Sequence, residues 1–483
     1  MTKDTAASLD QANSLTVKTD VAGVKLDSKA LSAVAQAKDD VTITVSDGGI
    51  TDKDVKASYT VTAEANGQNL LPYGGKKGTV TITVKVDDDT TAKDYQAWYV
   101  TGPTDSWSYV EELGLTDSAT PGCVDITIDH LSTVVLLGSG ATVTGVEAVV
   151  TDSQGTVTFS GSLADAITNA KSGESITLQK DVKENVTIPA GKDIVLELNG
   201  QKITNDPAST ATHTITVAYG GKLTVQDTVG GGIVDNVSHG CAAIWNNGTA
   251  VLNGGKYDRS KENGGSSSDA GGNSYYVLVN HGKMEINEGV TVAQNGHFSS
   301  MIENGYYSYH SGSASSGYVE NINDKNPSLV INGGSFSGGL NTVKNDDGGK
   351  LEINGGKFSN VSQAVVLNWN EATINDGTFT VTEPGVESVI LNGFISGGVD
   401  QGQLTINGGT LTSNTSAPVL TTMGGADHSG DIEITGGTLN GDIVLTDPKT
   451  DGKLEISQDA VINGDIINKK VADVTVTGGT VTG

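Results

Sequence analysis

The side chains that could carry out acid–base chemistry are few and far apart in this sequence. Asp346 and Asp347, in the stretch "NDD" at 345–347, form the nearest approach to a pair of hydrolytic carboxylates. Paired carboxylates can act as acid and base in glycoside hydrolysis. No basic motif that would complete such a set accompanies this pair. We therefore expect Asp346 and Asp347 to occupy a solvated turn, and we predict no catalytic residue.

Candidate metal ligands are also sparse. The stretch "VDDDT" at 86–90 offers hard oxygen atoms that suit calcium, but it lacks the glycine-turned loop and the distal glutamate of a known calcium motif. The seven histidines show no metal-binding spacing, and neither a nucleophile elbow nor a phosphate-binding glycine loop occurs. We predict a solvated hairpin at 86–90 and no metal or other cofactor.

Tyrosine is the residue type whose distribution stands out. Two stretches, "SYYVLV" at 274–279 and "HFSSMIENGYYSYHSGSASSGYVEN" at 297–321, hold six of the thirteen tyrosines of the chain. Tyrosine combines a large rigid contact area with a polar tip and is enriched at binding surfaces. The alternative is that these side chains pack their own loops against the rest of the fold. The predicted binding residues are Tyr275, Tyr276, Tyr306, Tyr307, Tyr309 and Tyr318.

A repeated phrase indicates the elements that must position these side chains. Stretches such as "LVINGG", "LEINGG" and "LTINGG" recur, and their polar corner residue falls at 199, 226, 253, 287, 332, 354, 375, 407, 435, 457 and 477. The shortest intervals are 20–22 residues and the longest is 45, so the others resemble one unit with insertions. The longest intervals predict loop insertions at about 257–275 and 297–325.

Each repeat contains two or three short runs with alternating apolar residues, which is typical of strands. Such short strands are stable only if successive coils stack about 4.8 Å apart and share backbone hydrogen bonds. We predict a parallel β-helix in which Ile331, Ile353, Ile374 and Ile406 form one inward column. Asparagine at equivalent corners is expected to form a hydrogen-bonded ladder. The usual crossover of parallel strands predicts a right-handed coil.

The predicted solenoid spans 141–483 and begins with a helical cap around 162–171, where Ser162 is placed to cap the helix. Residues 1–140 show alternating strands and one amphipathic helix at 27–38, which predicts a small β-rich, sandwich-like α+β domain. Trp245 and Trp369 are expected at coil corners, in a structural or a sugar-stacking role. The predicted fold class is therefore mainly β.

The order of these elements resembles a known family. The run "GSLADAITNAKSGESITLQKDV", then "VTIPAGKDIVLELNGQKIT", "LTVQD" and the serial "INGG" phrases, is similar to the pectate-lyase-like β-helix domains of large surface proteins from anaerobic Firmicutes. The segment before it looks like the small β-rich domain that often precedes them. The resemblance implies an architecture and a cell-surface location, and such proteins are mostly of unknown function or presumed adhesive.

The same resemblance allows an enzymatic alternative to be weighed. Pectate-type lyases use a cluster of aspartates for calcium and a basic residue, usually arginine, to abstract a proton. This chain has a single arginine, Arg259, which stands outside the coil pattern with only Asp258 beside it. "SHG" at 238–240 is superficially similar to the His-Gly of polygalacturonases, without their basic motif. The catalytic residues of these enzyme families therefore have no equivalents that we can assign in this sequence.

Charge and hydropathy argue against nucleic-acid binding and against a membrane-spanning segment. A net charge of −28 opposes binding to nucleic acid, which requires a basic face. No apolar run approaches the length of about 20 residues that spans a bilayer, and the first residues lack the features of a signal peptide. We expect a monomeric piece of a longer protein, displayed at the bacterial cell surface or wall.

The predicted function is a non-enzymatic adhesin or ligand-display module that binds a host or bacterial surface protein or a glycan. Its contact region would be the tyrosine-rich insertions between 257 and 325. The first alternative is a lyase or hydrolase that acts on acidic glycans, and the second is a passive stalk. Convergent carboxylates in one groove would favour the enzyme, whereas exposed, ordered tyrosines would favour the binding module.

Overall fold

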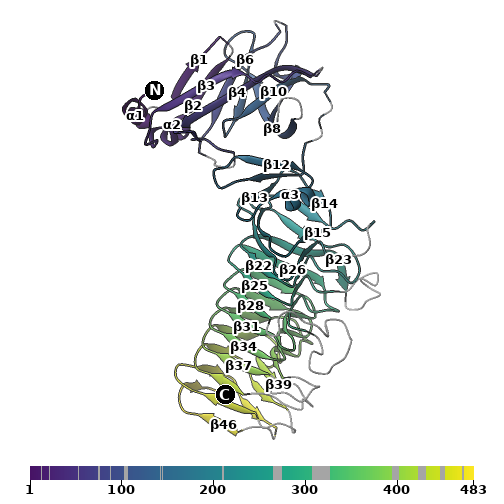
Figure 1. Cartoon of the computed structure of the whole chain (residues 1–483). Coiled ribbons are helices and arrows are strands. Elements are labelled where there is room, and N and C mark those ends of the chain that lie inside the picture. The colour runs from purple at the N-terminus through teal and green to yellow at the C-terminus, as the bar shows by residue number, and fades with distance from the viewer. Residues whose placement is uncertain are drawn as a thin grey trace. The chain divides into compact units, whose positions relative to one another are not determined.

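The computed structural model divides the chain into two compact units, 1–180 and 181–483. The predicted boundary at 140/141 lies within the first unit. Figure 1 shows the ribbon of the whole chain. The structure describes every residue except those at 12–13, 21, 53, 74–76, 88, 103–106, 142, 144, 209–211, 265–274, 307–326, 394–401, 423–430, 447–451 and 470–472.

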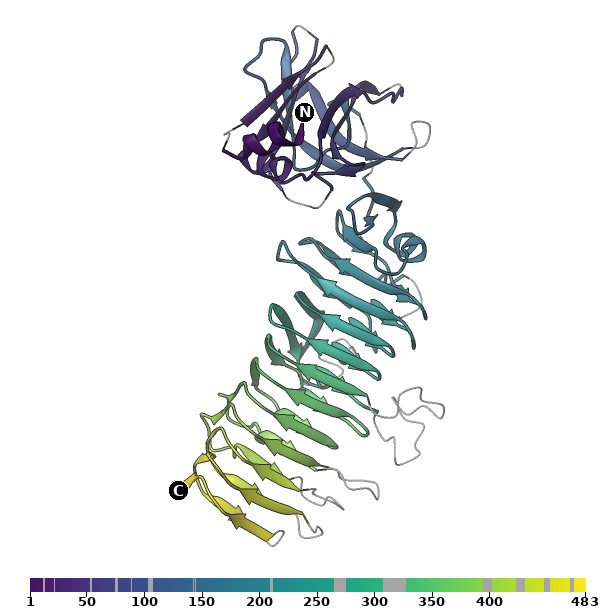
Figure 2. The ribbon, with the colours of Figure 1, turned by 60° about the vertical axis from the view of Figure 1, so that its left-hand side comes forward.

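The N-terminal unit is built on one curved antiparallel sheet, a half-barrel whose strand order is β1-β2-β6-β9-β8-β7-β10-β4-β3, with β5 on β4 (Figure 2). Strand β8 pairs with both β7 and β9, so the strands form a single sheet rather than the two facing sheets of a sandwich. The bounds are β1 Ser14–Lys18, β2 Gly23–Asp27, β3 Val41–Asp47, β4 Val55–Ala65, β5 Gln68–Asn69, β6 Val80–Lys85, β7 Tyr95–Thr101, β8 Ser108–Asp117, β9 Cys123–Ile128 and β10 Thr133–Gly138.

The helix predicted at 27–38 is confirmed as α2 (Ser28–Ala35), which is shorter than predicted at both ends. The carboxylate of Asp27 accepts a hydrogen bond from the backbone N–H of Ala30 and so caps the helix. Leu31 and Val34 are buried. The remaining helical elements of this sheet domain are α1 (Lys3–Ala7), η1 (Ser8–Gln11) and η2 (Ala92–Asp94).

The first unit ends with a hairpin and a short helix. Strand β11 (Ala148–Thr151) pairs antiparallel with β12 (Val157–Gly161) and with β13 (Ser175–Leu178). Between β12 and β13 lies α3 (Leu163–Asn169), whose N-cap is Ser162, as the sequence predicted. The helix buries Leu163, Ala166 and Ile167.

The second unit consists of three parallel sheets to which each coil contributes one strand. The first sheet contains β16, β19, β22 and every third strand to β46; the second runs from β14 to β47 and the third from β15 to β45 in the same way. A parallel β-helix, or solenoid of short strands, is therefore confirmed. The bounds are β14 Val182–Lys183, β15 Val186–Ile188, β16 Asp193–Glu197, β17 Lys202–Thr204, β18 Ile215–Val217, β19 Lys222–Gln226, β20 Ile233–Asp235, β21 Ile244–Asn246, β22 Thr249–Leu252, β23 Gly255–Gly264, β24 Leu278–Asn280, β25 Lys283–Ile286, β26 Val290–Gly296, β27 Ile302–Asn304, β28 Ser328–Ile331, β29 Ser335–Gly338, β30 Asn341–Asn345, β31 Lys350–Ile353, β32 Lys357–Asn360, β33 Ala364–Asn368, β34 Glu371–Ile374, β35 Thr378–Val381, β36 Ser388–Asn392, β37 Gln403–Ile406, β38 Thr410–Ser413, β39 Leu420–Thr422, β40 Ile432–Ile434, β41 Thr438–Asn440, β42 Ile443–Leu445, β43 Lys453–Ile456, β44 Val461–Asn463, β45 Ile466–Asn468, β46 Asp473–Val476 and β47 Thr480–Val481.

The predicted isoleucine column is present in the first sheet. Ile331 is in register with Ile353, Ile353 with Ile374, and Ile374 with Ile406. All four side chains are fully buried. A second column stacks aromatic rings in the second sheet, where Phe358 lies between Phe336 and Phe379 with ring centroids 4.6 and 4.7 Å apart.

Two asparagine ladders run along the solenoid. The predicted one follows the first sheet, where the side-chain amides of Asn253, Asn287, Asn332, Asn354, Asn375 and Asn407 bond one another at 2.7–2.9 Å. The second follows the third sheet and is fully buried; it comprises Asn246, Asn280, Asn304, Asn345, Asn368 and Asn392. In both ladders, the side-chain amide of one coil thus forms a hydrogen bond with the amide of the next coil.

The two predicted insertions begin with residues that belong to coils. The first overlaps β23, a long strand that pairs with β20 and β26, and the second overlaps β27, which pairs with β24 and β30. Residues 265–274 and 307–326 lie outside the described part of the chain. No helix among the described residues is long and apolar enough to cross a membrane.

Candidate functional site

The predicted tyrosines fall into three groups. Tyr275 and Tyr276 precede β24 and are half-buried. Tyr306 follows β27 and is only 3% exposed. Tyr307, Tyr309 and Tyr318 lie outside the described residues.

Tyr275 belongs to a compact group of rings beside the third sheet of the solenoid. The rings of His213 and Trp245 stack with centroids 4.3 Å apart, and Tyr275 lies 6.4 Å from Trp245 with its plane turned by only 13°. We call these three residues the aromatic cluster. Tyr276 packs edge-on against Tyr275. All three members remain partly accessible.

Trp245 was expected at a coil corner, but it is the middle residue of β21. Alternate residues of a strand point to opposite faces of a sheet. Ile244 and Asn246, on either side of it, are both fully buried, whereas Trp245 is partly exposed. The indole therefore projects from the outer face of the solenoid.

Buried polar contacts fix the backbone of Tyr275 from both sides. Its N–H donates to Glu262 Oε2 at 3.1 Å, and its carbonyl accepts a hydrogen bond from Gln294 Nε2 at 2.9 Å. Glu262 also pairs with Arg259, whose Nε lies 2.7 Å from Glu262 Oε2. Breaking such a fully buried pair is strongly destabilising, because it leaves an uncompensated charge. The network therefore orders the segment that carries Tyr275.

The interpretation that Arg259 stands outside the coils is wrong. Arg259 lies within β23 with its side chain fully buried, and its Nη2 donates to the carbonyl of Ser238 at 3.1 Å. The strand pairing of β23 places it there, because Tyr257 and Asp258 are in register with Val234 and Asp235 of the preceding coil. A guanidinium buried and paired in this way is structural rather than an exposed general base.

Burial and the nearby charge of Arg259 keep the aromatic cluster uncharged. Burial, and then Arg259, lower the pKa of His213 to about 4. Burial raises the pKa of the Tyr275 phenol above its ordinary value. At neutral pH the cluster therefore offers neutral rings whose edges carry N–H, N and O–H groups. Such a surface suits uncharged ligands with hydroxyl groups and apolar faces.

Tyr306, in contrast, is a packing residue by its contacts. Its ring stacks on His281 at 4.4 Å, and its hydroxyl donates to the carbonyl of His281 at 2.9 Å. Burial lowers the pKa of His281 to about 3, with His213 adding to the effect. The burial of Tyr306 does not support its predicted place on an exposed contact surface.

A group of charged side chains lies on neighbouring coils of the same sheet. Lys344, in register with Glu303, places its Nζ 2.8 Å from Asp346 Oδ2 and 3.9 Å above the ring of Trp369. Asp346 and Asp347 are fully buried, so the prediction of a solvated turn is wrong, although they do form a turn after β30. Burial and the neighbouring Asp346 raise the pKa of Glu303 well above its ordinary range, against the opposing effect of Lys344.

Glu303 and Asp346 therefore form a carboxyl pair in which burial and the neighbouring Asp346 favour the protonated form of Glu303. Such a pair is the type of group that acid–base catalysis uses. Here Glu303, Lys344 and Asp346 are each less than 10% exposed. The ion pair with Lys344 also satisfies the charge of Asp346, as in a structural contact.

The remaining sequence candidates show no assembled site. Ser238 of "SHG" is buried and accepts a hydrogen bond from Asn205 Nδ2. In "VDDDT", the carbonyl of Asp87 accepts a hydrogen bond from the Thr90 hydroxyl, as in a local turn. Within the described part of the chain, no group of three or more His, Cys, Asp or Glu side chains could hold a metal ion.

Comparison with known proteins gives no independent identification, because no family model, no curated protein and no solved structure matches this chain. The resemblance to pectate-lyase-like surface domains stays a prediction.

Sequence analysis did not identify His213, Glu262 and Gln294 as partners of Tyr275. The one signal that could have pointed to them was the single arginine in a chain with 57 acidic residues.

Proposed function

We propose that the protein is a non-enzymatic recognition module of the bacterial cell surface, and that the aromatic cluster of the solenoid binds a neutral glycan. The observation that carries this proposal is a partly exposed group of three stacked rings, of which Tyr275 is bonded through its backbone to a buried ion pair. Aromatic residues make up only 5% of the chain, so a group of three stacked rings at its surface points to a specific role. Partly exposed aromatic groups of this kind are typical of binding sites.

The charge of the chain favours a neutral partner. A net charge of −28 repels acidic polymers over the distance at which partners first meet. The cluster itself is uncharged at neutral pH, since His213 is held neutral.

We also propose a right-handed coil, an extracellular location, and α3 as the cap of the solenoid.

A binding array of neutral glycans and purified surface proteins, probed with the full chain, tests the proposal. The Trp245→Ala and Tyr275→Ala variants should lose signal on neutral glycans by about tenfold or more, because aromatic contacts contribute much of the binding energy at such sites. Tyr219→Ala is the matched control, since Tyr219 is 55% exposed on the same solenoid and lies outside the cluster. Binding confined to proteins, or equal losses in all three variants, would count against a glycan site.

The second candidate is a glycan-cleaving enzyme, and the carboxyl pair Glu303–Asp346 favours it. The assay is release of reducing ends or unsaturated uronate from acidic and neutral polysaccharides, with and without calcium. We expect no product, because the pair is buried and Arg259 is engaged with Glu262. Turnover that disappears in Asp346→Asn would establish the enzyme instead.

A further inference from the structure

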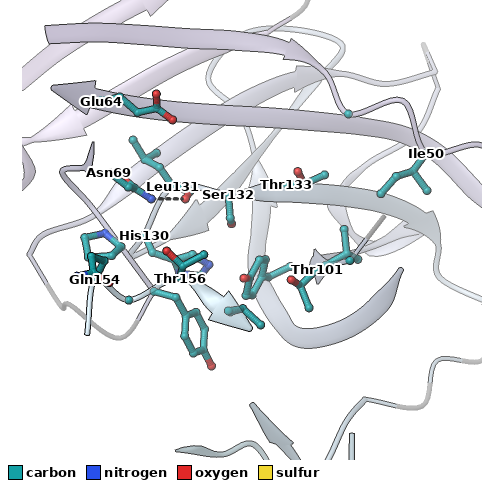
Figure 3. Close-up of a pocket in the computed structure, with 18 of the residues that line it drawn as sticks. Ile50, Glu64, Asn69, Thr101, His130, Leu131, Ser132, Thr133, Gln154 and Thr156 are labelled. Atoms are coloured by element: carbon teal, nitrogen blue, oxygen red, sulfur yellow. Dashed lines mark hydrogen bonds between the residues drawn. The ribbon is translucent and has the colours of Figure 1, made fainter. Parts of the chain in front are cut away.

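A cavity of about 400 Å³ lies in the N-terminal unit, far in sequence from the aromatic cluster. Its walls come from the end of β7, the start of β10, the β4–β5 hairpin and the turn before β12. Figure 3 shows Ser132 and Thr133 above Thr156, with Glu64 at the upper edge. A volume of this size is in the range of small-molecule sites in proteins.

Two buried polar atoms on this wall lack a partner. His130 Nε2 and Ser132 Oγ make no hydrogen bond in the described structure, although the imidazole is only 1% exposed. Buried polar atoms without partners are uncommon and require an explanation. Because both residues line the cavity, a bound ligand or water would satisfy them.

The neighbouring contacts orient His130. Its Nδ1 lies 2.9 Å from Asp129 Oδ1, and the tautomer that donates Nδ1–H to that carboxylate leaves Nε2 as an acceptor. Tyr73 and Tyr99 pack against the ring at 4.9 and 4.6 Å, and the Tyr73 hydroxyl is fixed by Gln179 Oε1 at 2.8 Å. The acceptor is therefore held rigidly.

The composition of the wall indicates the class of ligand. Beyond the two tyrosines, the polar lining consists of hydroxyl and amide side chains, those of Asn69, Thr101, Ser132, Thr133, Gln154 and Thr156. Glu64, at the exposed rim, is the one carboxylate among the lining residues, and they include no lysine or arginine. Among these described lining residues an anion meets no lysine or arginine, whereas a hydroxyl-rich neutral molecule meets donors, acceptors and an aromatic wall.

We propose that this cavity binds one or two residues of a neutral sugar, with a ligand hydroxyl donating to His130 Nε2 and another bonding Ser132 Oγ. The tyrosine rings would contact the apolar C–H groups of the sugar. This site is separate from the aromatic cluster and does not depend on it. The chain would then carry a second, independent sugar site.

The test uses the full chain and the methyl glycosides of glucose, galactose, mannose and N-acetylglucosamine, measured by saturation-transfer NMR and calorimetry. We expect saturable binding of at least one of them with a Kd of about 1 mM, as is usual for so small a ligand. Ser132→Ala should weaken that binding about fivefold, the loss of one hydrogen bond. It should leave the fold intact, because Ser132 Oγ has no partner to lose in the described structure.

Ser14→Ala, on the exposed strand β1 of the same unit, is the control and should bind as the parent chain does. Trp245→Ala should also leave this binding unchanged, which separates the cavity from the aromatic cluster. The proposal is overturned if no neutral glycoside binds, if methyl glucuronide binds more tightly than all of them, or if Ser132→Ala has no effect.

Discussion

Replacing one asparagine in each ladder measures how much burial adds to the stabilising effect of the ladder hydrogen bonds. Asn345→Ala alters the buried ladder and Asn354→Ala alters the half-exposed one, with the same atoms removed in both. Asn345 ends β30 and Asn354 directly follows β31, so the two residues lie on either side of one strand. Differences between the variants therefore report on the surroundings of the side chain.

The contacts of Asn345 set the expected magnitude. Its amide nitrogen donates to Asn368 Oδ1 at 2.8 Å and to the carbonyl of Glu371 at 2.9 Å, and its oxygen accepts from Asn304 Nδ2 at 2.8 Å. Removing it leaves at least two buried acceptors with one partner fewer. At about 1–3 kcal/mol for each unsatisfied buried group, the loss of unfolding free energy is about 3 kcal/mol.

Asn354 makes two ladder bonds, to Asn332 Oδ1 and from Asn375 Nδ2, where water can replace the missing partner. Its loss should therefore amount to less than about 1 kcal/mol. Urea unfolding followed by far-ultraviolet circular dichroism measures both values. Equal losses in the two variants would refute the claim that the buried ladder contributes more than the exposed one.

Three further predictions concern the core and the histidines. Ile353→Asp should destabilise the solenoid by several kcal/mol in the same urea assay, because it places a charge among fully buried isoleucines; a tolerated substitution would contradict the column. Tyr306→Phe should lower the unfolding free energy by about 1 kcal/mol, because the hydroxyl loses its hydrogen bond to the carbonyl of His281. Binding on the glycan array should stay unchanged. Loss of binding with unchanged stability would instead show that Tyr306 contacts the ligand. The folded-state pKa values of His281 and His213, about 3 and about 4, lie below the unfolded value of about 6.5. Their contribution to stability is thus fully present above pH 6.5 and falls as the pH drops toward 4, by up to about 1.4 kcal/mol per pH unit for each group. His281→Phe should reduce this slope, and an unchanged slope would show that His281 does not cause it.

The repeating part of the fold was predictable because each coil repeats the same physical problem. The alternation around Ile331, Ile353 and Ile374 fixed which residues face inward, and the asparagine after each strand marked the corner. With a strand period of two, a slip of one residue would turn these residues to the outer face. The first ladder and the column followed directly.

The second ladder escaped prediction since its asparagines end strands that begin with varied residues, such as "IWN", "LVN" and "AVVLN". Arg259 and Asp346 were misplaced for a related reason. Charged side chains are rarely buried without partners. The ion-pair partners here are local, Glu262 three residues after Arg259 and Lys344 two residues before Asp346. The neighbouring coils supply the further contacts, because Arg259 also donates to Ser238 and Lys344 is in register with Glu303, and local composition does not reveal that register.

The aromatic cluster was half predictable. Tyrosine enrichment pointed to Tyr275, but the stacking partners His213 and Trp245 come from two earlier coils and belong to no shared motif. The curved single sheet of the first unit was missed because alternating strands alone do not distinguish a half-barrel from two facing sheets.

The most direct test of the recognition site is fluorine NMR of the chain labelled with 5-fluorotryptophan. The chain has four tryptophans, of which Trp98 and Trp107 belong to the first unit and Trp245 and Trp369 to the solenoid. Single Trp→Phe variants assign the four resonances, and the neutral glycan selected by the array is then titrated in. We predict that the Trp245 resonance shifts with saturation while the other three stay in place. A stationary Trp245 resonance at saturating glycan, with any other tryptophan moving instead, would contradict the proposed site.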